Sequence, residues 1–139
     1  MRSMLAWTGV VGALGVLIGA FGAHGMPDHL AARGLEADLI VRRLGQFDVG
    51  VRYHLVHAVA MLAVVSLREL SPRVRRWVFG LMVSGVILFS GSLYVLVATN
   101  TPWLGAITPL GGVSWIAAWV VLASAGFWSA RENRGDDLG

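Results

Sequence analysis

Three stretches of the chain are continuously apolar and contain no charged side chain. They run over residues 4–23, 77–98 and 107–128. A helix that rises 1.5 Å per residue needs about 20 residues to cross a hydrocarbon core of roughly 30 Å. Each stretch is long enough, so the pattern predicts three membrane-spanning helices.

A further span is predicted over residues 49–67, although its clean apolar run begins only at Leu55. The extension includes Arg52, and an arginine at the centre of a span costs about 2.5–3.5 kcal/mol. Arg52 lies roughly 22 Å along the helix from Leu67, where its side chain can reach the far headgroups. Asp48, one turn earlier, is placed to pair with it.

The connection between the first two spans, residues 24–50, has an apolar stripe at helical spacing. The stripe consists of Leu35, Leu39, Ile40, Leu44, Phe47 and Val51. This spacing predicts an amphipathic helix that runs into the second span. Two placements are open: the helix lies at the membrane interface, or it packs on the bundle. The fold class is therefore an all-α integral membrane protein, a single domain (1–139) with four transmembrane helices and an amphipathic helix between spans one and two.

Composition supports this class. The chain of 139 residues is 56% hydrophobic and 14% charged, whereas soluble domains carry about 25% charged residues. The net charge is +3, but the arginines fall between the apolar runs and form no stripe with aromatic residues, which argues against nucleic-acid binding. Cysteine is absent, which excludes disulfides, thiolate metal sites and a cysteine nucleophile. No serine–histidine–acid set is evident, so an enzyme is the less favoured class.

The arginines also predict the orientation of the chain. The N-terminus, the loop 68–76 and the C-terminus lie on one side and hold Arg2, Arg68, Arg73, Arg75, Arg76, Arg131 and Arg134. The other side holds Arg33, Arg42, Arg43 and Arg52. Arginine-rich short loops stay cytoplasmic, so both termini are predicted inside, with the first span retained rather than cleaved as a signal peptide. A bacterial inner membrane is the favoured location, and the mitochondrial inner membrane is the alternative.

Most of the unusual polar residues fall in one layer, in the outer half of the predicted bundle. The candidate functional residues are His24, Tyr53, His54, His57, Ser90, Ser92, Tyr94 and Thr108. His54 and His57 are three residues apart, so they are expected to share a helix face. Three interpretations are open: a hydrogen-bonded core, a metal or haem site using two of His54, His57 and His24, and a site for protons or a small ligand. No cofactor is predicted.

Small residues and a proline suggest how the helices pack. Gly15, Gly19 and Ala23 form a stripe on the first span that favours close packing within the monomer. Pro109 is expected to start the last helix rather than to break it.

Four strings resemble domain-of-unknown-function family 423, which includes the animal transmembrane protein 256 group. They are GAFGAHG at 19–25, YHLVHAVAML at 53–62, LFSGSLYVL at 88–96 and ITPLGG at 107–112. The resemblance implies a four-span inner-membrane or mitochondrial protein and no established activity.

Two classes of function are open on these grounds. The first is an accessory or binding subunit in the bilayer, either within a larger membrane complex or homo-oligomer or as a module that binds lipid or quinone. The second is a protein that uses its histidines to handle protons, metal or a small ligand, as a transporter-like or haem-binding protein would.

Overall fold

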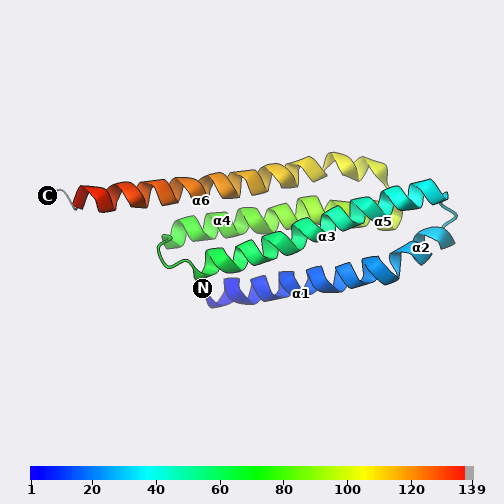
Figure 1. The fold of residues 1–139 in the computed structure, drawn as a ribbon, viewed down its shortest axis with the longest axis horizontal. Coiled ribbons are helices and arrows are strands. Elements are labelled where there is room, and N and C mark those ends of the chain that lie inside the picture. Colours follow the sequence, from blue (N-terminus) through cyan, green and yellow to red (C-terminus); the bar gives the residue numbers. More distant parts are fainter. Residues whose placement is uncertain (137–139) are drawn as a thin grey trace.

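The computed structural model describes the backbone of residues 1–136 and the side chains of residues 1–128. The described residues form helices joined by short connections (Figure 1). Its elements are α1 (Arg2–His24), α2 (Met26–Ala32), α3 (Ala37–Ser66), α4 (Pro72–Gly85), η1 (Val86–Gly91), α5 (Ser92–Thr99), η2 (Pro102–Ala106) and α6 (Thr108–Asp136).

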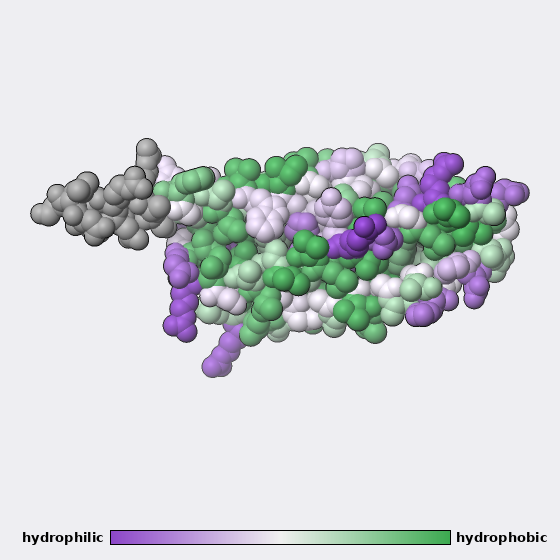
Figure 2. Space-filling model, viewed as in Figure 1, coloured by the Kyte–Doolittle hydropathy of each residue, from purple (hydrophilic) through white to green (hydrophobic). Residues whose placement is uncertain are grey.

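Four helical segments are long and apolar enough to cross a membrane, namely Arg2–His24, Ala37–Ser66, Pro72–Thr99 and Pro102–Trp128. They run up and down in sequence (Figure 1). The N-terminus and the loop 67–71 lie at one end, called here the near end. The short helix α2 and the loop 100–107 lie at the opposite end, the far end. On the face shown in Figure 2, hydrophobic residues (green) lie along the length of the bundle, and strongly hydrophilic residues (purple) gather mainly toward its two ends.

The amphipathic stretch is present, but it is not a separate helix. It forms the first part of α3, whose 30 residues extend over about 45 Å because nothing between residues 37 and 66 breaks the helix. Leu35, Ile40, Leu44 and Val51 pack against a far-end core of Met26, Leu30, Phe47, Leu96 and Val97. Of the two open placements, the structure therefore shows packing on the bundle.

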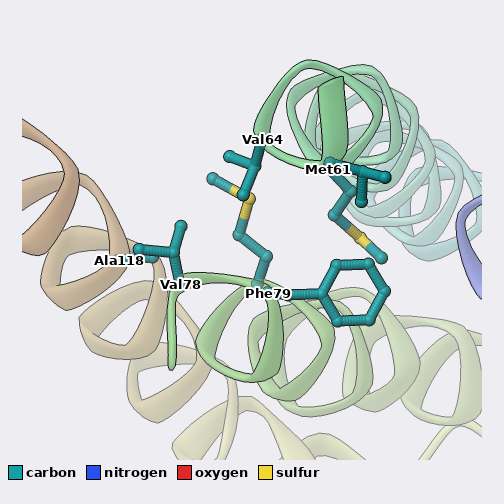
Figure 3. Close-up of a cluster of buried hydrophobic side chains, with 7 residues drawn as sticks. Met61, Val64, Val78, Phe79 and Ala118 are labelled. Carbon is teal, nitrogen blue, oxygen red and sulfur yellow. The ribbon is translucent and has the colours of Figure 1, made fainter. Parts of the chain in front are cut away.

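The four spans form an open arrangement in which α3 and α4 are central. Helix α1 packs mainly on α3, and α6 packs on α4 and η1. Side chains from α3, α4 and α6 meet in a near-end core of Met61, Val64, Val65, Val78, Phe79, Met82 and Ala118 (Figure 3). Only Thr8 and Gly15 of α1 are buried, so most of this helix faces outward.

The third span contains a π-helical segment, η1, between α4 and α5. Such segments often occur at functional sites. Helix α6 approaches it closely, since a Cβ built on Gly111 would lie 2.3 Å from the backbone nitrogen of Phe89. Thr108 is the first residue of α6 and Pro109 the second, so Pro109 starts the helix as expected.

Arginine side chains close the helix ends. At the far end Arg43 is buried and donates from Nε and Nη2 to Oδ1 of Asn100, at 2.9 and 2.7 Å. Arg33 donates to the carbonyls of Ala98 and Thr99 at the C-terminus of α5, where the helix dipole favours a cation. Arg52 pairs with Asp48 at 2.5 Å, which confirms the predicted ion pair.

At the near end the buried Arg75 donates to the carbonyls of Leu67 and Leu70, just after the end of α3. A cationic side chain thus closes the helix ends on both sides of the bundle.

Candidate functional site: a layer of histidine and aromatic side chains

His54 is buried in α3 and uses both ring nitrogens. Its Nε2 lies 3.0 Å from the carbonyl oxygen of Val11 on α1, and its Nδ1 lies 3.1 Å from the hydroxyl of Tyr94 on α5. A carbonyl only accepts, so Nε2 carries the proton, and the Tyr94 hydroxyl donates to Nδ1. These two bonds link three spans through one imidazole.

Gly15 leaves the space that lets α1 approach His54 on α3. A Cβ at Gly15 would lie 3.3 Å from Cδ2 of His54 and 2.8 Å from a methyl carbon of Leu55. Gly19, one turn further, would likewise meet Val51 at 3.0 Å. The small-residue stripe therefore serves packing within the monomer, as predicted.

His57 makes a different set of contacts. Its Nδ1 lies 2.8 Å from the carbonyl oxygen of Tyr53, so Nδ1 carries a proton. Its ring lies on the indole of Trp115 in α6, with centroids 3.7 Å apart and planes 5° from parallel. Tyr53 also stacks on Trp115, at 5.7 Å and 14°, and Phe89 contacts both Tyr53 and Trp115.

Trp115 is the centre of this aromatic cluster. Its Nε1 donates to the carbonyl of Met82 at 3.1 Å, and the neighbouring Ser114 donates to the carbonyl of Leu81 at 2.8 Å. A Cβ on Gly85 would lie 2.2 Å from Trp115 Nε1, so only glycine leaves room for the indole. Trp115 thereby fixes α6 against the turn that precedes η1.

The hydroxyl residues of the layer join η1, α5 and α6. Ser92 donates to the carbonyl of Phe89 at 2.9 Å and lies 2.8 Å from Oγ1 of Thr108. Because the proton of Ser92 is used at the carbonyl, Thr108 donates to Ser92. Ser90 is fully buried, and its hydroxyl makes no hydrogen bond of ordinary geometry within the described residues.

His54 and His57 are neighbours on the continuous helix α3, but their rings meet different spans. His54 contacts α1 and α5, whereas His57 stacks on α6. Residues three apart differ by about 60° around a helix, and the neighbouring spans separate the two rings further. His24 is exposed at the end of α1, away from both.

The three histidines named as candidate metal ligands therefore do not converge. Within the described residues no group of three or more histidine, aspartate or glutamate side chains is placed to hold a metal ion. His54 has no free lone pair, since both of its nitrogens are engaged. His57 keeps one, at Nε2.

Sequence reasoning missed Trp115, Trp119 and Phe89. Tryptophan concentrates at membrane interfaces, yet Trp115 and Trp119 lie roughly 20 and 14 Å from Trp128, well inside the span. Their distance from the end of the span could have marked both tryptophans as packing residues from the sequence alone. Trp119 contacts the edge of His57, with centroids 6.4 Å apart.

An apolar groove lies beside His54, between α1 and the third span. Its volume is about 510 Å³, and its lining residues are Trp7, Val10, Val11, Leu14, His54, Phe79, Gly80, Val83, Val86 and Ile87. It exists because α1 packs mainly on α3 and leaves a gap toward α4. His54 is the one ionisable residue of this lining.

Comparison with known proteins places this arrangement in a family. The family model described as "Protein of unknown function (DUF423)" matches residues 18–112. The chain belongs to the DUF423 family. The matched range includes His54, His57, Tyr94, η1 and Thr108, and it ends before Trp115.

Relatives of this DUF423 chain are membrane proteins of bacteria. The UPF0382 membrane protein YwdK of Bacillus subtilis is 38% identical, covering 84% of this chain and 92% of its own. A UPF0382 membrane protein of Staphylococcus saprophyticus is 34% identical, covering 85% and 94%. The UPF0382 inner membrane protein YgdD of Escherichia coli is 30% identical, covering 87% and 86%. No solved structure matches the chain. The predicted family and four-helix membrane fold are confirmed.

Proposed function

We propose that the protein is a non-catalytic membrane module that binds one hydrocarbon chain, of a lipid or an isoprenoid compound, in the groove beside His54. The observation that carries the proposal is the groove's nearly continuous apolar lining. Pockets of about 300–1,000 Å³ with such linings are typical of binding sites for small apolar molecules.

The position of the groove suits a chain that enters from the near-end leaflet. Its wall on α1 extends from Trp7, close to the start of the helix, to Leu14. His54 lies roughly 18 Å from Ser66 at the near end of α3, beyond the midplane of a 30 Å core. A chain in the groove would therefore run from the near-end interface toward the centre of the bilayer.

Two glycines allow a matched test. Gly80 lines the groove, whereas Gly12 lines a shallower apolar depression between α1 and α3, and a Cβ at either position meets nothing within 4 Å. Gly80→Leu should project into the groove with no clash at its Cβ, and Gly12→Leu should project only into the depression. The probe is a phospholipid with a diazirine in its acyl chain, incorporated into nanodiscs with the purified protein.

Peptide mass spectrometry then locates the photolabel. The proposal expects labelling at 7–14 and 83–87 that falls in Gly80→Leu and persists in Gly12→Leu. Equal labelling of every lipid-facing helix, or no change in Gly80→Leu, would contradict it.

An accessory role within a larger assembly is compatible with the open arrangement. Within the most apolar window of each span, only 11% of α1 and 17% of the last span are buried, against 39% and 44% for the two central spans. We therefore propose that α1 and α6 supply the surfaces for any larger complex or homo-oligomer.

We also propose the bacterial inner membrane as the location, with both termini in the cytoplasm. The bonding of the arginines supports this orientation. At the far end Arg33, Arg43 and Arg52 are bound to protein groups. Among the near-end arginines whose side chains are described, Arg2, Arg68, Arg73 and Arg76 are exposed and Arg75 is buried, whereas Arg42 is the exposed arginine of the far end that forms no such bond. The unbound positive charge thus lies mainly at the near end, the side that the positive-inside rule assigns to the cytoplasm.

A further inference from the structure

Three polar groups on the α3–α6 side of the bundle have no partner within the described residues. They are the hydroxyl of Tyr53, Nε2 of His57 and Nε1 of Trp119, for which no hydrogen bond is formed, although all three residues make ring contacts. Tyr53 is 48% exposed and Trp119 46% exposed. His57 is buried as a residue, yet its unpartnered Nε2 keeps some contact with the surface.

The depth of these groups makes their lack of partners costly. His57 lies nine residues from the near end of α3, which is roughly 14 Å from the near-end interface and close to the midplane of a 30 Å core. Trp119 lies one helical turn nearer to that interface than Trp115, on which His57 stacks. Water is not available there, and an unpaired polar group in hydrocarbon is strongly destabilising. A bound polar molecule would remove that cost.

The hydrogen-bonding capacities of the three groups are complementary. Because Nδ1 of His57 donates to the carbonyl of Tyr53, Nε2 of the neutral ring has a free lone pair and accepts. The indole Nε1 of Trp119 donates only, and the hydroxyl of Tyr53 can do both. A ligand that fits must therefore offer an oxygen acceptor and an O–H donor on one small framework.

The ring planes indicate a flat framework. The rings of Tyr53, His57 and Trp115 lie within 14° of parallel to one another. Aromatic rings favour offset stacking with other rings. A hydrocarbon chain would leave the polar groups unpaired, and a partner helix presents few flat polar surfaces at this depth.

We propose that the exposed rings of Tyr53 and Trp119, together with the buried His57 and Trp115 that they contact, bind the ring of a membrane-soluble quinone or quinol. A quinone carbonyl accepts from Trp119 or Tyr53, and a quinol hydroxyl donates to Nε2 of His57. The site is separate from the groove beside His54, since His57 contacts α6 whereas His54 contacts α1. If no quinone binds at His57, the proposal for the groove beside His54 still stands. If no hydrocarbon chain binds in the groove, the quinone proposal still stands.

The test uses the full-length protein in nanodiscs and a benzoquinone with a decyl tail and an azido group on its ring. The photolabel should map to 53–57 and 115–119 and be displaced by unlabelled decyl-benzoquinol held in its reduced form, whose hydroxyls can donate to Nε2 of His57 and accept from Trp119 or Tyr53. Tyr53→Phe and His57→Phe keep a ring and remove one hydrogen-bonding group each. Each should raise the competitor concentration for half-displacement by about two- to tenfold, the value of one neutral hydrogen bond.

Trp103→Phe, at an exposed tryptophan of the far-end loop, is the matched control and should change nothing. Circular dichroism and gel filtration establish that each variant is folded. The proposal is overturned by labelling that is not saturable, or by half-displacement that is equal in wild type, Tyr53→Phe and His57→Phe. It is also overturned if a photoreactive residue at position 56, exposed on the same side of α3, captures a helix of another protein chain instead of the quinone.

Discussion

The imidazole of His57 lies flat on the indole of Trp115, 3.7 Å away, and this contact joins the second span to the last. These spans otherwise have few backbone approaches, since α6 packs mainly on α4 and η1. The same indole donates to Met82 on α4. Trp115 therefore holds three spans together from a single position.

Replacing Trp115 should cost more stability than replacing Trp119. Trp115→Phe removes the bond to Met82 and part of the stack, and interhelical hydrogen bonds in membranes contribute about 0.6 kcal/mol on average and up to about 1.7. We expect a loss of about 1–2 kcal/mol in the free energy of unfolding. Trp119→Phe, at a half-exposed position, should stay within about 0.5 kcal/mol. Unfolding by sodium dodecyl sulfate in mixed micelles measures both, and equal losses would contradict the assigned role of Trp115.

A methyl group at Gly111 should weaken the contact between α6 and η1. Its Cβ would lie 2.3 Å from the backbone nitrogen of Phe89, and backbone cannot move aside as a side chain can. Overpacking typically costs about 1–3 kcal/mol, which is the loss expected for Gly111→Ala. Gly9→Ala, where nothing lies within 4 Å, is the control and should gain up to about 1 kcal/mol from helix propensity. Thermal unfolding in detergent distinguishes the two signs, and a stabilised Gly111→Ala would show that α6 does not approach η1 this closely.

His54 and Tyr94 should be energetically coupled. Tyr94→Phe removes only the hydroxyl that donates to Nδ1, and His54→Leu removes the acceptor together with the bond to Val11. A double-mutant cycle isolates the shared bond, for which we expect a coupling energy of about 0.6–1.7 kcal/mol. The cycle is read from unfolding free energies of the two single variants and the double variant. Additive losses would mean that the bond contributes nothing to stability.

The proposed orientation can be tested directly because the chain has no cysteine of its own. Glu69→Cys lies in the near-end loop and Ala32→Cys at the end of α2, and both positions are exposed. In intact bacterial spheroplasts, a membrane-impermeant maleimide should label Ala32→Cys and leave Glu69→Cys unlabelled until the membrane is opened. The reverse pattern would place both termini outside the cytoplasm.

The sequence by itself determined the number of spans and the way they alternate. Apolar length is a local property, so runs of about 20 residues identify spans without knowledge of their neighbours. The pair of Asp48 and Arg52 and the start of α6 at Thr108 were predictable for the same reason, since both depend on residues within one helical turn.

Only the tertiary structure decided which neighbours each side chain meets. His54 and His57 are three residues apart, yet one bonds to α1 and α5 and the other stacks on α6. That divergence depends on close approaches at Gly15 and Gly85, where the absence of a side chain admits a ring from another helix. A sequence shows that a glycine is small, but which ring fills the space depends on how distant helices pack.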